Sequence, residues 1–97
     1  YNTIMAQDLH IGQIPELRQF GKNLNQASIA LNTLFNQLGN QMNRACGTWQ
    51  DGQALRFMEE FRSSRADVEK MSRTMMEFSD YIQRYCQAAE AVQNVRM

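Results

Sequence analysis

A seven-residue repeat of apolar side chains is the feature that most constrains the fold of this 97-residue chain. Its first run advances in alternating steps of three and four, with Gln41 as the one polar interruption: Leu17, Phe20, Leu24, Ala27, Leu31, Leu34, Leu38 and Ala45. Its second run keeps that spacing, with Ser64 as the clearly polar member: Ala54, Phe57, Phe61, Ser64, Val68, Met71, Met75, Phe78, Ile82, Tyr85, Ala89 and Val92. A period of about 3.5 is typical of helices that pack side by side, whereas strands alternate every two residues. The repeat therefore predicts an all-α chain with two long helices.

The short segment between the two runs predicts how the helices are joined. Pro15 suits the first turn of a helix, where its missing N–H leaves no hydrogen bond unmade, and Gly47 is placed to end that helix. The second helix can begin at Thr48 or at Asp51, because either side-chain oxygen can accept from a free backbone N–H. The prediction is an antiparallel helical hairpin. It comprises an N-terminal arm (1–13) and a hairpin domain (14–97), with helices at about 14–46 and 52–95 and a turn at about 47–51.

Two glycines, Gly21 and Gly39, lie inside the first predicted helix. Each should cost about 1 kcal/mol relative to alanine. Either they are tolerated on the surface, or they allow a neighbouring helix to approach closely, and the sequence leaves both interpretations open.

Further apolar side chains lie beside the repeat rather than in it: Phe35, Met42, Leu55, Met58 and Met76. They widen the apolar face beyond what one neighbouring helix can cover, and a chain of this size buries only about two thirds of its unfolded surface. We therefore expect the hairpin to dimerise into a four-helix bundle, either with a second copy or with a different, similar hairpin. The alternative is that Lys and Arg stems shield a wide stripe on a lone hairpin.

Charge and hydropathy argue against several classes of partner. Ten basic and ten acidic residues give no net charge, which argues against binding to nucleic acid or to an anionic membrane surface. No stretch offers the roughly 20 apolar residues of a membrane span, so none is expected. The first ten residues also lack the basic start and apolar run of a Sec signal peptide. The true N-terminus stays open, because the chain begins with Tyr1 and contains Met5.

Few residues in the sequence are of the types that catalyse reactions or bind metals. His10 is the one histidine, and no carboxylate is combined with a histidine, a glycine-rich phosphate loop or a nucleophile. Cys46 and Cys86 should lie at opposite ends of the hairpin, roughly 50–60 Å apart and beyond the reach of a disulfide, so we expect free or intermolecular thiols. The sequence predicts no catalytic residue, no metal site and no cofactor, and therefore not an enzyme.

The tryptophan of the chain lies in the predicted turn, in the segment CGTWQDGQALRFMEEF. Here the sequence resembles the WXG-motif family of small helical hairpins, the early secreted antigen type of type VII secretion substrates. The likeness is greatest to variants whose turn reads Thr-Trp-x-Asp followed by Phe and a Glu-Phe pair, matched here by Thr48, Trp49, Asp51, Phe57, Glu60 and Phe61; Gly52 also belongs to the turn motif of this chain. Most members of the family have glycine two residues after Trp, where this chain has Asp51, with Gly52 one place later.

The resemblance implies a non-catalytic protein-interaction module that acts as a secreted factor or as a carrier for a co-exported partner. It also implies binding to secretion machinery or to a toxin, and secretion without a Sec signal peptide from a cytoplasmic pool. Trp49 is either a hydrophobic plug over the helix ends or a docking residue that acts with Asp51 and Phe57.

The export signal of that family, a tyrosine followed four residues later by an acid, is not present: Tyr81 is followed by Tyr85, and Tyr85 by Ala89. Three explanations stay open: the signal lies beyond Met97, a partner supplies it, or this variant is not exported by that machine. A different class of function also stays open, a cytoplasmic helical structural adaptor or the targeting domain of a larger toxin.

Overall fold

The fold of the chain was obtained as a computed structural model that describes residues 12–96, with side chains described as far as residue 92. It contains three helices: α2 (Gln13–Cys46), α3 (Gly52–Ser63) and α4 (Arg65–Arg96). The all-α prediction is confirmed in this part of the chain. The predicted N-terminal arm, including His10, lies almost wholly outside the described residues.

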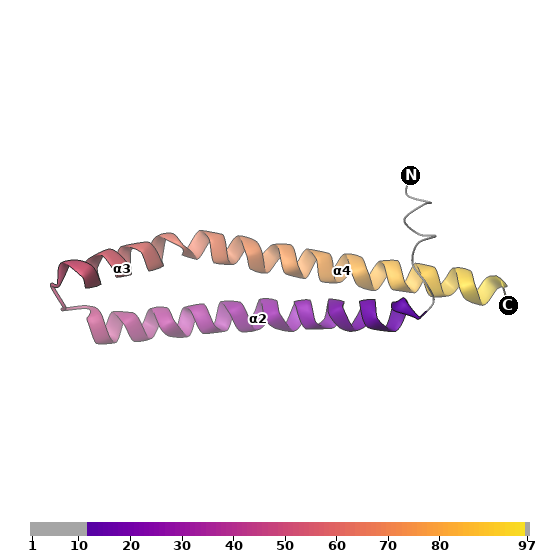
Figure 1. The fold of residues 1–97 in the computed structure, drawn as a ribbon, viewed down its shortest axis with the longest axis horizontal. Helices are drawn as coiled ribbons and strands as arrows, with labels where there is room; N and C mark the ends of the chain where they lie inside the picture. The colour runs from indigo at the N-terminus through magenta and orange to yellow at the C-terminus, as the bar shows by residue number, and fades with distance from the viewer. Residues whose placement is uncertain (1–11, 97) are drawn as a thin grey trace.

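The helices form a long, thin hairpin in which α2 runs back alongside α3 and α4 (Figure 1). The molecule measures 68 × 24 × 16 Å along its principal axes, so it is little more than two helices wide and one helix thick. Among the described helices, none combines the length and the hydropathy that crossing a membrane requires.

The turn between the helices is fixed by a helix cap. Asp51 has an extended backbone and is the N-cap of α3. Its carboxylate oxygen Oδ1 accepts hydrogen bonds from the backbone N–H groups of Gln53 at 2.8 Å and Ala54 at 3.2 Å. A carboxylate at this position also faces the positive end of the helix dipole. Of the two predicted starts of the second helix, Thr48 and Asp51, the structure therefore uses Asp51.

The second predicted helix is divided rather than continuous. It bends at Ser64, which separates α3 from α4. The hydroxyl groups of Ser63 and Ser64 both donate to the carbonyl oxygen of Glu60, at 3.0 and 2.8 Å. Serine hydroxyls that bond back to a carbonyl of the preceding turn compete with the helical hydrogen bonds and bend helices. The uninterrupted heptad spacing gave no sign of this bend.

Small residues line the seam along which α2 packs against α4. Ser28 and Ser72 are fully buried, and their hydroxyl oxygens lie 2.6 Å apart. Each hydroxyl also lies within hydrogen-bonding distance of the other residue's backbone carbonyl, at 3.0 and 3.2 Å. Asn32 Nδ2 donates to Ser72 Oγ at 2.7 Å. Every buried side-chain N or O atom in the described region has a hydrogen-bond partner, so this polar seam carries no unpaired group.

Gly21 lies in the same seam, where the hydroxyl of Ser79 donates to its carbonyl oxygen at 2.6 Å. A Cβ atom on Gly21 would lie 2.9 Å from Ile82 Cγ2 and from Gln83 Nε2. Gly39 is also buried, but its Cβ would be no closer than 3.4 Å to Phe61 and Arg65. Of the two interpretations of these glycines, close approach of a neighbouring helix is the one that the structure shows.

Apolar clusters close the two ends of the seam. Ile14, Ile82 and Cys86 form one cluster near the start of α2, and Met42, Ala54 and Met58 form the other beside the turn. Cys46 packs against the second cluster, so the two cysteines lie at opposite ends of the hairpin and both are free. This agrees with the predicted separation.

An ion pair joins the helices at the open end. Arg18 Nη1 and Nη2 donate to the two carboxylate oxygens of Glu90, at 3.1 and 2.7 Å. The hydrogen bond from Arg18 lowers the pKa of the Glu90 carboxyl below its ordinary value, and the pKa of Arg18 is raised by the same bond. Both side chains are partly exposed, so the pair fixes the register of the helix ends rather than supplying much stability.

The two buried glycines give a matched test of the seam. Gly39→Ala should raise the free energy of unfolding by up to about 1 kcal/mol, because the new methyl group makes ordinary contacts and alanine favours the helix. Gly21→Ala should lower it, because overlap with the β-branched Ile82 side chain outweighs that gain. Urea denaturation measures both. An increase for both variants would contradict the close approach at Gly21.

The Arg18–Glu90 pair predicts a pH dependence. Because the pKa of Glu90 is lowered on folding, its contribution is complete above the unfolded value of about 4.3 and is lost as pH falls through the folded value. The stability difference between wild type and Glu90→Gln should therefore be largest at neutral pH and vanish on acidification. A difference that stays constant from pH 7 to pH 3 would show that the ion pair is not formed.

Candidate interaction face

The apolar repeat of α2 is rotated away from the seam. Leu17, Leu24 and Leu31 are only half-buried against α4, while their repeat partners point outward. These exposed residues are Phe20, Ala27 and Leu34. The seam is centred on another seven-residue row: Ile14, Gly21, Ser28, Phe35 and Met42. Within this row, Gly21 and Ser28 are small residues at the position nearest to α4, and the half-buried leucines flank them.

Helices α3 and α4 show the same rotation. One row of the repeat, from Ala54 to Ala89, lies in or beside the seam, but its partner row is largely exposed at Phe57, Met71 and Phe78. A third row, which includes Ser72 and Ser79, completes the seam. The sequence repeat therefore places only half of its members between the two helices.

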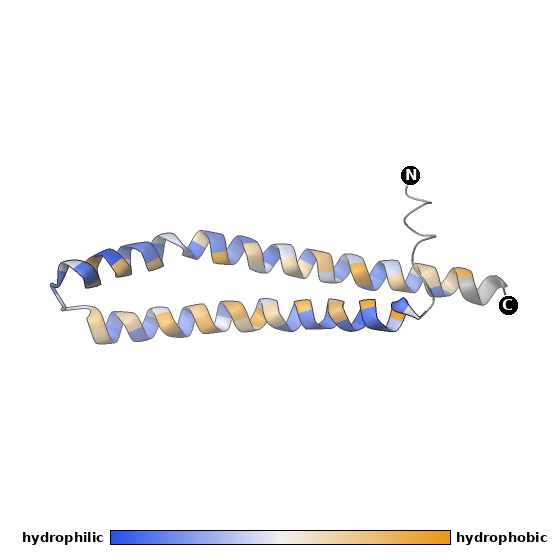
Figure 2. Cartoon of the chain, viewed as in Figure 1, coloured by the Kyte–Doolittle hydropathy of each residue, from blue (hydrophilic) through white to orange (hydrophobic). Residues whose placement is uncertain are grey.

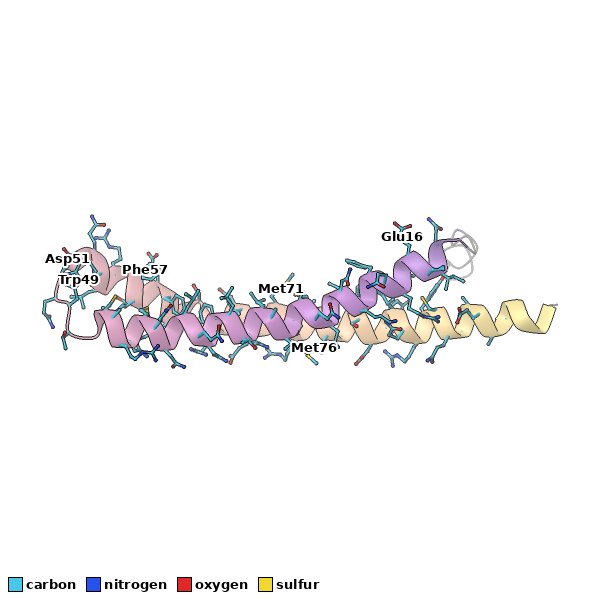
Figure 3. All side chains as sticks on the ribbon, turned by 90° about the horizontal axis from the view of Figure 1, so that it is seen from below. Glu16, Trp49, Asp51, Phe57, Met71 and Met76 are labelled. Carbon is cyan, nitrogen blue, oxygen red and sulfur yellow. The ribbon has the colours of Figure 1, made fainter. Side chains whose placement is uncertain are left out.

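The two exposed rows lie on one side of the hairpin. On each helix, the exposed row comes one residue before a row that faces the other helix. This spacing is a rotation of about 100° about the helix axis. Because the helices run in opposite directions, equal turns bring both rows to one side. Figure 3 shows Phe57 and Met71 projecting to that side, and Figure 2 shows apolar segments recurring along both helices rather than only where they meet. We call this surface the apolar face; its exposed large side chains are Phe20, Leu34, Leu38, Phe57, Met71, Phe78 and Tyr81.

An aromatic ladder forms part of the apolar face on α4. The ring of Tyr81 lies 5.9 Å from that of Phe78 and 6.1 Å from that of Tyr85, measured between centroids. Rings at this spacing pack against one another. They form a flat apolar surface, and the tyrosine hydroxyl groups lie at its edge. Such side chains are enriched at the centres of protein interfaces.

The accessible surface is large for the mass of the chain. It amounts to 7733 Å². A compact monomer of 11.3 kDa would expose about 5,700 Å² by the usual scaling of surface with mass. The difference, about 2,000 Å², accompanies the elongated shape of the chain, which extends over 68 Å.

The five side chains that the sequence assigned to a partner face lie in different environments in the structure. Met42 and Met58 are 8% and 3% exposed, in the hairpin's own core, which corrects the expectation that they lie open to a partner. They pack with Ala54 in the apolar cluster beside the turn. Leu55 and Met76 are exposed, but they share the row that faces away from the apolar face, and Figure 3 shows Met76 opposite Met71.

Phe35, the fifth of those residues, is half-buried inside the hairpin at the bend. Its ring stacks on that of Phe61, with centroids 4.2 Å apart and planes within 5°. The Arg65 guanidinium lies 5.3 Å from the centroid of the Phe35 ring and donates to Asn36 Oδ1 at 2.8 Å. An open groove beside these side chains is lined by Asn32, Phe35, Asn36, Arg65, Val68, Glu69 and Arg73. Phe35 therefore packs within the bent region of the hairpin, and its assignment to a partner face stays a prediction.

The turn motif is displayed at the tip of the hairpin (Figure 3). Trp49 is 55% exposed and Phe57 is 58% exposed, so the indole does not plug the helix ends. The Trp49 backbone N–H donates to the carbonyl oxygen of Cys46 at 3.0 Å, which holds the turn while leaving the ring free. Asp51 is occupied by its capping bonds, and Thr48 and Gly52 are exposed. Trp49 and Phe57 are the large apolar side chains of the motif that a partner can reach.

Within residues 12–96, no three His, Cys, Asp or Glu side chains are grouped as metal ligands would be. Comparison with models of protein families, with curated proteins and with solved structures gave no match. The resemblance to the WXG-motif family therefore rests on the turn motif and the hairpin alone, and it stays a prediction.

Two adjacent residues test which row faces inward. In the dilute, monomeric chain, Met58→Ala should lower the free energy of unfolding by about 2–5 kcal/mol, because it leaves a cavity beside the turn. Phe57→Ala should change it by no more than about 0.5 kcal/mol, since the ring is exposed. Urea denaturation at low protein concentration measures both. Equal losses would mean that the repeat, rather than the small-residue seam, packs the hairpin.

Proposed function

We propose that this chain is a non-catalytic protein-interaction module of the type VII secretion substrate kind, acting as a secreted factor or as a carrier for a co-exported partner. The apolar face is the observation that carries the proposal. The hairpin exposes several large apolar side chains, among them Phe20, Met71 and Phe78, and such a surface favours association with another protein.

The shape of the apolar face supports a helical partner. It follows two antiparallel helices over most of the hairpin, with large side chains at heptad spacing. A pair of helices from a second hairpin fits this spacing and would complete a four-helix bundle. Leu55 and Met76, on the opposite side, are not part of the proposed contact.

The tip supports a second, separate contact. Trp49 presents an exposed ring at the end of the hairpin, and the capping bonds of Asp51 hold the turn in place. Exposed tryptophan on a rigid turn is a typical anchor for a protein groove. Under this proposal the tip docks on the secretion machinery while the apolar face holds the partner.

Export from the source bacterium tests the proposal. The chain should accumulate in the culture medium, and deletion of the type VII membrane ATPase should reduce it to background. Trp49→Ala should reduce export at least tenfold, whereas Trp49→Phe, which keeps an aromatic ring, should largely preserve it. Immunoblots of medium and cells measure both, with equal cellular amounts showing that the variants fold. Export without the ATPase would refute the assignment and favour an adaptor.

A further inference from the structure

We infer that the groove beside the bend is a second docking surface, whose occupant is a helix of another protein that carries acidic, basic and acidic side chains at intervals of four residues. We call this surface the bend groove; Asn32, Asn36 and Arg73 are among the side chains that line it. The inference goes beyond the proposed function, because neither the apolar face nor the turn motif includes these residues.

The bend groove and the apolar face lie on opposite sides of the hairpin. On α4, Arg73 comes one residue after Ser72 of the seam, whereas Met71 of the apolar face comes one residue before it. A step of one residue is a rotation of about 100° about the helix axis, in opposite senses in these two cases. Glu69 also lies in the same seven-residue row as Met76, which Figure 3 shows opposite Met71. A partner can therefore occupy the groove while another protein covers the apolar face.

The charges that line the groove alternate along α4. Arg65, Glu69 and Arg73 follow one another at intervals of four residues, and all three line the groove. Residues four apart lie on one side of a helix, about 6 Å apart along its axis. The groove therefore presents positive, negative and positive charge in sequence. An adjacent helix with acidic, basic and acidic side chains at the same spacing matches this order, whereas a polyanion would meet the Glu69 carboxylate.

Two of these three charges have no partner within the described part of the chain. Glu69 and Arg73 form no side-chain hydrogen bond or ion pair there, although their spacing would allow one. The ion pair that the described residues do form joins Arg18 to Glu90, at the other end of α4. The charged groups of Glu69 and Arg73 are therefore available to a ligand, and no internal ion pair has to break before binding.

The third charge, on Arg65, is held in place by contacts within the hairpin. Its guanidinium lies 5.3 Å from the centroid of the Phe35 ring, and its Nη1 donates to Asn36 Oδ1 at 2.8 Å. A guanidinium has five N–H donors, so several remain for a carboxylate. Because these contacts already restrict the Arg65 side chain, binding a carboxylate costs it less conformational entropy than it would cost a free arginine.

The size and openness of the groove favour a protein segment over a small molecule. Its volume of about 410 Å³ lies near the lower end of the range for ligand pockets, and it is an open groove. Pockets for small molecules enclose most of the ligand surface, which an open groove cannot do. Side chains from one side of a helix need no such enclosure, and half-buried Val68 offers them apolar contact.

Binding of two model peptides tests the charge pattern. Both are fluorescein-labelled, alanine-based helical peptides; one carries Glu, Lys and Glu at intervals of four residues, and the other carries Lys, Glu and Lys at the same positions. Because this chain has no net charge, a preference between them reports the local pattern rather than overall attraction. The Glu-Lys-Glu peptide should bind at least about fivefold more tightly in anisotropy titrations at about 50 mM salt, and high salt should reduce the difference. Equal affinities, tighter binding of the inverted peptide or no binding would overturn the inference.

A matched pair of variants tests the location of the site. Arg73→Glu should weaken binding of the Glu-Lys-Glu peptide about fivefold or more, because it replaces an attraction with a repulsion. Lys70→Glu makes the same change of charge at an exposed side chain of α4 outside the groove, and it should change the affinity less than about twofold. Circular dichroism checks that both variants keep their helices. Equal losses of affinity would show that overall charge governs binding and would overturn the assignment to the groove.

A third peptide, with Glu at all three positions, tests the role of Glu69. Wild type should bind it more weakly than the Glu-Lys-Glu peptide, because its central carboxylate meets that of Glu69. Glu69→Gln should reverse this order, since the variant groove keeps its two arginines without the acid between them. Tighter binding of the all-Glu peptide to wild type would make the groove a simple anion site and overturn the alternating pattern.

Discussion

The buried contact between Ser28 and Ser72 is the interaction on which the rest of the structure depends. Two small hydroxyl side chains that satisfy each other allow α2 and α4 to approach closely, with Gly21 and Ser79 extending the contact toward the open end. A buried hydroxyl without its partner would cost about 1–3 kcal/mol, so the network favours one rotation and one register of the helices. That choice turns the large apolar residues outward.

The hairpin consequently gains less hydrophobic stabilisation from contacts within the chain than it would if its large apolar side chains were buried. Apolar surface stabilises by roughly 25 cal/mol per Å² only when it is removed from water, and here much of it remains exposed. The apolar clusters at the two ends, with Ile82 at one and Met58 at the other, hold the hairpin closed. Burial of the apolar face against a partner would add hydrophobic stabilisation. We therefore expect assembly to raise the stability of the hairpin.

Much of the architecture follows from local sequence. The alternating steps of three and four specify helices, and the interval between the two runs specifies an antiparallel return. Asp51 identifies the start of the second helix once its capping bonds are considered. Sequence reasoning missed the rotation of the helices, because it assigned the strongest apolar row to the seam. The rows of small residues, with Ser72 and Ser79 seven apart and Gly21 and Ser28 seven apart, were the signal that marks a close contact.

The sequence by itself determined the helical class, the hairpin, the position of the turn motif and the separation of Cys46 from Cys86, because these depend on spacing along one chain. Only the tertiary structure decided which side of each helix faces inward, where the second helix bends, and that Met42 and Met58 are core residues. Those outcomes depend on competition between packing large side chains and pairing small polar ones across the seam. Periodicity specifies an apolar side, but it does not specify whether that side is buried within the chain or presented to another one.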